Sequence, residues 1–280
     1  MPTAKQRRQA AQRHLQRQLE RRAEINRRRR RNLGILATVA VVAIVVSAVI
    51  LLNNVGGDDT SAAADSSAST APTTSSAAAT TNPDGTIACT YTPDTSGNPN
   101  LKDVGTPPSP EKTPTQGTST LLMRTNQGDL TLTLDRAKAP CAAASFTYLA
   151  EKKFFDGSVC HREVNQPNFG VLQCGDPTGS GSGGPTYKFG EEVTPNTKYP
   201  RGTIAMANSG GGGTTGSQFF LCFTDTHLPP QYTAVGTVDK AGLAVLDKIA
   251  KAGNDGSFEP SPGGGKPKVP VEIKSITVAG

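Results

Sequence analysis

The 280-residue chain has little of what most catalytic metal and nucleophile sites require. It has three histidines, His14, His161 and His227, and its five cysteines never take the paired CxxC spacing of a zinc site. The GxSxG turn of a serine hydrolase is also missing. Cys160 and His161 are adjacent, so on a strand they would point to opposite faces and could not act as a nucleophile and its base. The sequence therefore predicts no metal site and no cofactor.

Two glycine-rich stretches match the spacing of a dinucleotide-binding loop but lack its context. Residues 179–184 and 211–216 both have G-x-G-x-x-G spacing. Neither opens a helix, because the first continues into PTYKFG and the second into SQFFLCF. Without a helix N-terminus there is no cradle for phosphate groups. Both stretches are therefore expected to be loops.

Charge is absent from Leu33 to Leu52 (LGILATVAVVAIVVSAVILL), a run of 20 residues. As a helix it would be about 30 Å long, which is the thickness of the hydrocarbon core of a bilayer. We expect a transmembrane helix over residues 32–53 that contacts the lipid bilayer through residues 33–52. The alternative is a cleaved signal peptide, but the apolar core of such a peptide is usually about 7–15 residues long.

Positive charge is concentrated before this apolar run. Residues 1–31 carry a net charge of +10, against +6 for the whole chain, so the rest of the chain is acidic on balance. This distribution predicts a basic cytoplasmic tail that contacts anionic lipid headgroups, and no nucleic-acid partner is expected. The protein is then a single-pass protein of the cell membrane, with its N-terminus in the cytoplasm and its C-terminal domain outside.

Residues 54–118 are rich in Ser, Thr, Ala and Pro and have hardly any aromatic residues. Such a composition does not bury enough apolar surface to offset the entropy lost on folding, so we expect a flexible, disordered linker. Residues 119–280 remain for one globular domain, and this length is sufficient for a single core.

Short strands dominate the structure expected for this domain. A hairpin is expected over residues 120–134, where leucines alternate with polar residues around a turn. Helices are expected over residues 139–152, with a proline at the start, and 241–252, with a glycine after the end. The remaining strands are expected at 158–164, 171–174, 202–207, 217–223, 233–238 and 271–278. This pattern indicates a mostly β fold, a closed antiparallel barrel capped by two α-helices.

All five cysteines follow the apolar run, which fits an oxidising compartment. Cys160 and Cys174 flank an expected hairpin, and we hypothesise a disulfide between them. A second bridge is expected to tie Cys89, near the end of the linker, to Cys141. Cys222 lies in an apolar strand and is expected to be a buried free thiol.

Four sequence blocks follow one another across residues 120–280: FDGSVCHR (155–162), LQCGD (172–176), MAN (206–208) and GSQFF (216–220). In this order they resemble the cyclophilin family of peptidyl-prolyl cis/trans isomerases, in a membrane-anchored form similar to actinobacterial ones. The resemblance implies an eight-stranded barrel. It also implies that the domain accelerates rotation about Xaa-Pro bonds in proline-containing peptides and unfolded exported proteins, outside the cytoplasmic membrane.

The resemblance also implies roles for individual residues. Arg162 would be catalytic by donating a hydrogen bond to the prolyl nitrogen, and Gln173 would orient Arg162 and bind a substrate carbonyl. His161 is expected to have a hydrogen-bonded structural role, because the reaction transfers no proton. The residues implied in substrate binding are His161, Phe169, Val171, Met206, Ala207, Asn208, Gln218, Phe220, His227, Leu228 and Tyr232.

Several residues depart from the family pattern. The chain between Arg162 and Gln173 is a few residues longer than usual, and the family's pocket-wall phenylalanine falls at Gly170, with Phe169 one place earlier. His227 stands where many eukaryotic members have tryptophan, which implies weak cyclosporin binding. These departures leave an alternative open, a low-turnover chaperone or scaffold that binds proline-containing peptides on a cyclophilin fold.

Overall fold

The computed structural model describes residues 81–210 and 212–279. The expected basic tail, the expected transmembrane helix and residues 54–80 of the expected linker lie outside this part of the chain. Among the described residues, no helix is long and apolar enough to cross a membrane.

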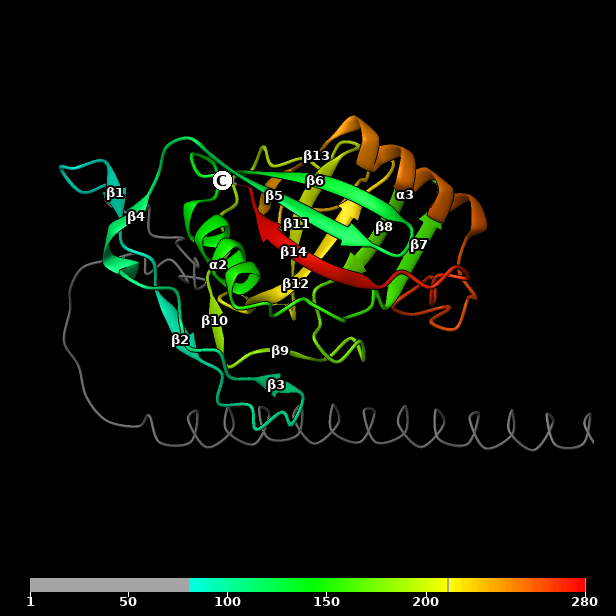
Figure 1. The fold of residues 1–280 in the computed structure, drawn as a ribbon, viewed down its shortest axis with the longest axis horizontal. Helices are drawn as coiled ribbons and strands as arrows, with labels where there is room; N and C mark the ends of the chain where they lie inside the picture. The colour runs from blue at the N-terminus through cyan, green and yellow to red at the C-terminus, as the bar shows by residue number, and fades with distance from the viewer. Residues whose placement is uncertain (1–80, 211, 280) are drawn as a thin grey trace, which may run out of the picture. The chain divides into compact units, whose positions relative to one another are not determined.

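Strands make up most of the regular structure (Figure 1). The helices are α2 (Pro140–Glu151), α3 (Lys240–Ala252) and the short 3-10 helix η1 (Pro110–Lys112). The strands are β1 (Thr86–Ile87), β2 (Tyr91–Pro93), β3 (Leu101–Lys102), β4 (Thr113–Pro114), β5 (Thr118–Thr125), β6 (Gly128–Asp135), β7 (Arg162–Gln166), β8 (Phe169–Cys174), β9 (Gly184–Pro185), β10 (Tyr187–Phe189), β11 (Thr203–Asn208), β12 (Thr215–Cys222), β13 (Ala234–Val238) and β14 (Ile273–Val278).

The main sheet is antiparallel and strongly curved. Its strands follow the order β14-β5-β6-β13-β11-β12, and the sheet continues from β12 through β8 to β7. Alternation within the strands places one set of side chains inside, such as Leu130, Leu132 and Leu134 of β6, which are almost fully buried. These inward side chains form the main apolar core together with residues of α2 and α3.

The expectation of a closed barrel is corrected to a half-barrel. The end strands β7 and β14 share no continuous ladder, and the gap between them is spanned by an isolated bridge from Val159 to Glu272. The outer edge of β7 is instead covered by the loop after α3, because Glu163 and Gly265 exchange two backbone hydrogen bonds of 2.7 and 3.0 Å. A covered edge no longer needs a strand partner.

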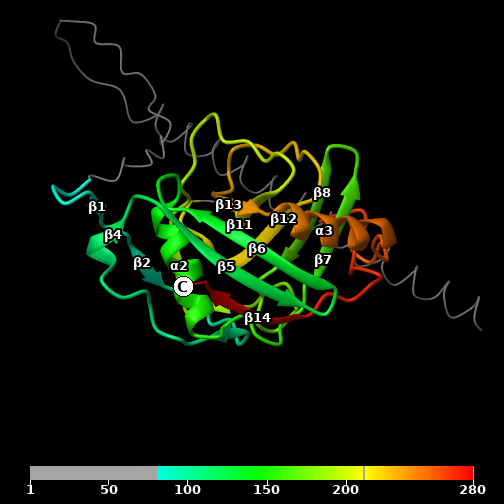
Figure 2. The ribbon, with the colours of Figure 1, turned by 45° about the horizontal axis from the view of Figure 1, so that its top comes forward.

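Helices α2 and α3 lie at different ends of the half-barrel in both views (Figure 1 and Figure 2). Helix α2 begins with Pro140 in its first turn, where a missing N–H is tolerated. The next two N–H groups, of Cys141 and Ala142, donate to the carboxylate of Glu192 over 2.9 and 2.8 Å. Helix α3 is capped by Asp239, whose Oδ1 accepts from the backbone N–H of Gly242 over 2.9 Å. Both helices agree with the expected ones to within one residue at each end.

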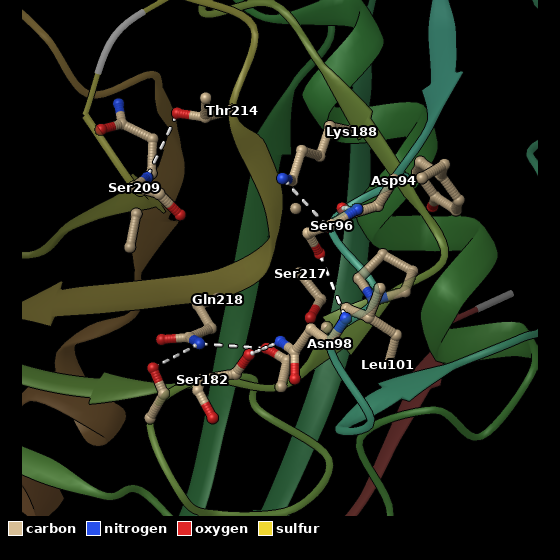
Figure 3. Close-up of a pocket in the computed structure, with 18 of the residues that line it drawn as sticks. Asp94, Ser96, Asn98, Leu101, Ser182, Lys188, Ser209, Thr214, Ser217 and Gln218 are labelled. Carbon is tan, nitrogen blue, oxygen red and sulfur yellow. Dashed lines mark hydrogen bonds and ion pairs between the residues drawn. The ribbon is translucent and has the colours of Figure 1, made fainter.

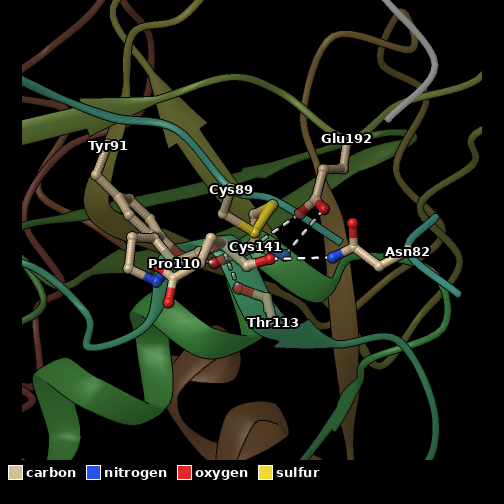
Figure 4. Close-up of a disulfide and its surroundings, with 9 residues drawn as sticks. Asn82, Cys89, Tyr91, Pro110, Thr113, Cys141 and Glu192 are labelled. Atoms are coloured by element: carbon tan, nitrogen blue, oxygen red, sulfur yellow. Dashed lines mark hydrogen bonds between the residues drawn. A yellow bond between two sulfur atoms is a disulfide. The ribbon is translucent and has the colours of Figure 1, made fainter. Parts of the chain in front are cut away.

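Residues 81–117 differ from the expected flexible linker, because they form an ordered arm along the domain. In this arm β2 pairs with β10, and β3 pairs in parallel with β9. The ring of Tyr91 packs edge-on against Tyr187 and Phe189, with centroids 5.4 and 5.7 Å away. Cys89 is bonded to Cys141 at the start of α2, and Figure 4 shows Tyr91 and Glu192 beside this bridge. One covalent bond and one aromatic anchor thus order a segment whose average composition predicts disorder.

The second disulfide joins Cys160 to Cys174, and Cys222 is a buried free thiol. These are the two pairs and the free cysteine that the sequence led us to expect. The Cys160–Cys174 bridge links residues next to the paired positions Arg162 and Gln173, so it fixes the open end of the β7–β8 hairpin.

Replacing both Cys89 and Cys141 with serine should lower the free energy of unfolding by about 4 kcal/mol. The bridge joins residues 52 positions apart and so restricts the conformations of the unfolded chain. Without it the unfolded state gains conformational entropy and becomes more favourable. Urea unfolding of the full chain in detergent micelles under non-reducing conditions, compared with wild type, measures the effect. An unchanged midpoint in the double variant would show that the arm is held without the bridge.

Candidate active site

Arg162 and Gln173 face each other on neighbouring strands. Arg162 begins β7, and the register of the β7–β8 hairpin sets it opposite Gln173. Both lie on the same face as Val164 and Val171, which belong to a second apolar cluster outside the main core. The Nη1 of Arg162 donates to Oε1 of Gln173 over 3.1 Å. Burial lowers the pKa of Arg162, and the Glu259 carboxylate is among the groups that oppose this shift. The arginine remains cationic at neutral pH.

A chain of hydrogen bonds extends from Gln173 to a loop. Nε2 of Gln173 donates to Oε1 of Gln218 over 2.9 Å, and Nε2 of Gln218 donates to the carbonyls of Gly181 and Gly183. This loop is held by the buried carboxylate of Asp176, which accepts from the N–H groups of Thr178, Gly181 and Gly183. Burial opposes ionisation of Asp176, but these hydrogen bonds outweigh it and lower its pKa.

An apolar pocket of about 520 Å³ lies beside the guanidinium. Its floor is the second apolar cluster, in which Phe220 is only 5% exposed. The ring of Tyr232 meets Phe220 edge-on with centroids 5.5 Å apart, and the hydroxyl of Tyr199 fixes Tyr232 by donating to its carbonyl over 2.9 Å. The pocket therefore combines an apolar floor, an aromatic rim and one cation.

Phe169 supplies the wall next to Arg162. As the first residue of β8 it shares a face with Val171 and Gln173, and its ring centroid lies 6.0 Å from the guanidinium carbon of Arg162. Gly170 faces the other way, where a Cβ would come within 2.4 Å of Thr224 Oγ1 and 2.6 Å of the Phe223 ring. A phenylalanine at 170 would therefore not fit, and the chain places the aromatic wall one residue earlier.

A second, more polar pocket of about 510 Å³ adjoins the first. It shares Gln173, Gly181, Ala207 and Asn208 with the apolar pocket. One wall comes from residues 94–101 of the arm, and Figure 3 shows Asp94 and Lys188 pointing toward one another there, with an ion pair of 3.0 Å. The two pockets form one continuous groove along the outer face of the sheet.

The structure brings most of the sequence-predicted residues together in the apolar pocket. Those that line it are His161, Arg162, Phe169, Val171, Gln173, Ala207, Asn208, Phe220, Leu228 and Tyr232. Three predicted residues do not. Met206 points inward into the main core, Gln218 lines the polar pocket, and His227 is exposed beside a separate depression. Met206 was placed wrongly because neighbours on a strand alternate in direction, and the outward positions of β11 are Ala205 and Ala207.

Sequence reasoning missed the contribution of the loop after α3. Phe258 and Pro262 line the apolar pocket, and the carbonyls of Pro262 and Gly263 accept hydrogen bonds from Arg162. The glycine- and proline-rich sequence of this segment predicts a loop but not the surface on which it lies.

His161 is buried in the pocket wall, and its Nδ1 has no hydrogen-bond partner among the described residues. The hydrogen-bonded role expected for it is therefore absent at this nitrogen. Burial lowers the pKa of His161, which keeps the ring neutral at physiological pH. Residues 81–210 and 212–279 contain no group of side chains that could hold a metal ion.

A half-barrel with two helices and an outer groove, in which a glutamine holds an arginine over an apolar floor, defines a cyclophilin-like domain. The family model described as "Cyclophilin type peptidyl-prolyl cis-trans isomerase/CLD" matches residues 120–278. The chain belongs to this family.

Relatives from mycobacteria agree with the family assignment. A Mycobacterium tuberculosis protein named "Probable peptidyl-prolyl cis-trans isomerase B" is 46% identical over 166 residues, which are 55% of this chain and 52% of that protein. Its namesake from Mycobacterium leprae is 44% identical over 203 residues, 68% of this chain and 66% of that protein. The matches thus span about half to two thirds of these relatives. "Peptidyl-prolyl cis-trans isomerase A" of M. tuberculosis is 37% identical, and 58% of this chain matches 93% of that protein.

A crystal structure of a Cryptosporidium parvum cyclophilin-type peptidyl-prolyl cis-trans isomerase is 29% identical and aligns with 59% of the chain at a TM-score of 0.49.

Glu163 lies next to Arg162 but faces the interior of the half-barrel. Its side chain is fully buried, and neither carboxylate oxygen has a hydrogen-bond partner among the described residues. Burial raises the pKa of Glu163 to about 7, and the charge of Lys268 opposes this shift only in part. A buried carboxyl without partners favours its neutral form.

Glu163 should make the protein less stable as pH rises from about 4.5 to about 7. In this window the folded protein retains the proton that the unfolded chain has lost, so the stabilisation present below pH 4.5 disappears by pH 7. Glu163→Gln should match wild type at low pH and exceed its free energy of unfolding at pH 8, by about 3 kcal/mol at most. Urea unfolding at several pH values measures this, with the exposed Glu272→Gln as control. Equal pH profiles for wild type and Glu163→Gln would contradict it.

Proposed function

We propose that the chain is a peptidyl-prolyl cis/trans isomerase that accelerates rotation about Xaa-Pro bonds in polypeptides. The observation that carries the proposal is the Arg162 guanidinium, held by Gln173 at the edge of an apolar pocket that is large enough for a proline ring. Membership of the cyclophilin family supports the same activity.

The chemistry of this reaction needs no nucleophile and no proton transfer. Amide resonance opposes rotation, with a barrier of about 18–20 kcal/mol for a peptide bond. In the twisted transition state the nitrogen regains its lone pair and becomes a hydrogen-bond acceptor. A donor that binds this nitrogen stabilises the transition state more than either ground state, which is the condition for catalysis.

Each part of the groove has a separate task in the proposed reaction. The floor around Phe220 binds the proline ring, and Phe169 and Tyr232 close its sides. Arg162 donates an N–H to the imide nitrogen as the bond twists, and Gln173 holds the guanidinium in place. Asn208, at the junction of the two pockets, is positioned to bind the peptide backbone on the side that leads into the polar pocket.

Arg162→Ala should lower kcat/KM for an Xaa-Pro tetrapeptide about 100-fold, since loss of one transition-state donor typically costs about 3 kcal/mol. A protease-coupled isomerisation assay on the full chain in detergent micelles measures the change. The exposed Arg124→Ala variant, which also loses one arginine, should keep the wild-type rate. Equal rates for wild type and Arg162→Ala would favour the alternative function, a binding module for proline-containing peptides with little turnover.

The proposed setting is the outer face of a cytoplasmic membrane, with exported proteins as substrates. Two observations support it. Residues 33–52 are long and apolar enough for an anchor, with positive charge on their N-terminal side. The two disulfides of the domain are of a kind that persists in oxidising compartments. We also propose that the domain binds cyclosporin weakly, because His227 stands where many eukaryotic members of the family have tryptophan.

An epitope tag after Gly280 should bind a membrane-impermeant antibody on wall-stripped cells, whereas a tag before Met1 should bind only after permeabilisation. Deleting residues 33–52 should release the chain from the membrane fraction. Antibody access to the N-terminal tag in sealed cells would reverse the proposed orientation.

A further inference from the structure

The loop after α3 contacts the group to which the proposed chemistry is assigned. Nε of Arg162 donates to the carbonyl of Gly263 over 3.0 Å, and Nη2 donates to the carbonyl of Pro262 over 2.7 Å. With the bond to Gln173, these contacts use three of the five N–H groups of the guanidinium. The remaining two belong to the terminal nitrogens, so the loop holds one edge of the guanidinium and leaves donors for a substrate.

Glu259, a residue of this loop, stabilises it through hydrogen bonds. Its Oε1 accepts from the backbone N–H of Gly264 over 2.6 Å and from Nε2 of Gln166, at the end of β7, over 3.2 Å. Backbone bonds between Phe258 and Gly264 and between Gly263 and Phe258 close the same turn. Through Gln166 the carboxylate also ties the loop to the strand that carries Arg162.

The path of the loop tolerates little change. Gly264 has a φ of +73°, and a Cβ there would lie 2.1 Å from the carbonyl oxygen of Glu163. Gly265 is equally confined, because its Cβ would lie 2.3 Å from Asp255 Oδ1. The loop thus lies directly against the backbone of β7, and a shift of Gly264 would move the carbonyls that hold Arg162.

The negative charge of Glu259 also affects Arg162, in addition to the hydrogen bonds that hold the loop. It raises the pKa of Arg162 against the effect of burial, so it favours the cation. The carboxylate does not bond the guanidinium directly, which leaves the arginine's N–H groups to the loop carbonyls and to the substrate.

We infer that Glu259 is a positioning residue of the isomerase: it holds residues 258–264 where the carbonyls of Pro262 and Gly263 orient the Arg162 guanidinium for the imide nitrogen. The inference rests on the proposed function. An arginine side chain loses much rotamer entropy when it is fixed, and orienting it before substrate binds removes that loss from the reaction step.

NMR exchange spectroscopy on an Xaa-Pro peptide with the full chain in detergent micelles tests this role, because it separates peptide affinity from the rate at saturation. Glu259→Ala should lower the saturated exchange rate about tenfold and leave the KM within about twofold, as expected for a group that acts only in the transition state. Glu259→Gln should retain most of the rate, because its amide oxygen still accepts from Gly264. Glu151→Ala, an exposed glutamate of α2, should match wild type.

A double-mutant cycle separates positioning from general damage to the fold. If Glu259 acts through Arg162, the variant Arg162→Ala with Glu259→Ala should be no slower than Arg162→Ala alone. A further tenfold loss in the double variant, or an unchanged rate in Glu259→Ala, would overturn the inference. A faster Glu259→Ala enzyme would also overturn it, since the loop would then obstruct the site. A wild-type chain no faster than Arg162→Ala would instead reject the proposed function itself.

Discussion

The register of the β7–β8 hairpin is the constraint on which the groove depends. A slip of one residue in a strand pair turns every side chain to the other face. Here such a slip would move Arg162 into the interior and bring Glu163 out beside the apolar floor. Two features prevent it: a tight turn at Asn168, whose φ is +59°, and the Cys160–Cys174 disulfide at the other end of the hairpin. The hairpin is therefore fixed at both ends.

The two faces of this hairpin contribute to different parts of the molecule. Inward side chains such as Leu172 join the main core, while outward ones such as Val171 join the cluster under the groove. The strand backbone separates the two apolar regions, so the floor of the pocket is supported from below by a packed interior. Side chains on such a support keep their geometry better than side chains on a free loop.

Local periodicity in the sequence was sufficient for most elements of the domain, but not for the short strands β9 and β10, for the strands of the arm or for every contact between elements. The β5–β6 hairpin and both helices follow from alternation and capping residues, the two cysteine pairs were hypotheses, and the structure contains all of them. The family resemblance predicted that Arg162, Gln173 and Phe220 lie in one pocket, and the structure brings them together there. Met206 shows the limit, since a residue inside a recognised motif still alternates with its neighbours and points into the core.

The remaining differences come from interactions between distant parts of the chain. The arm has the composition of a linker, and its order depends on Cys141 and Tyr187, which are about fifty and a hundred residues away. The half-barrel likewise stays open because the loop at Gly265 takes the place at β7 that a closing strand would occupy. The Cys89–Cys141 bridge was expected from the sequence, but neither the packing of Tyr91 on Tyr187 nor the pairing of the loop at Gly265 with β7 can be recognised from local sequence.

The bridge between Cys89 and Cys141 determines what happens to the chain when a protease cuts the arm. Between these residues the chain passes through residues 105–109, all of which except Pro107 are exposed, and such accessible backbone outside regular structure is where proteases cut. A cut there would divide the polypeptide but leave its two pieces covalently joined through sulfur. The cleaved molecule would keep its N-terminal portion, so a single cut in the arm would not separate the domain from the residues before 81.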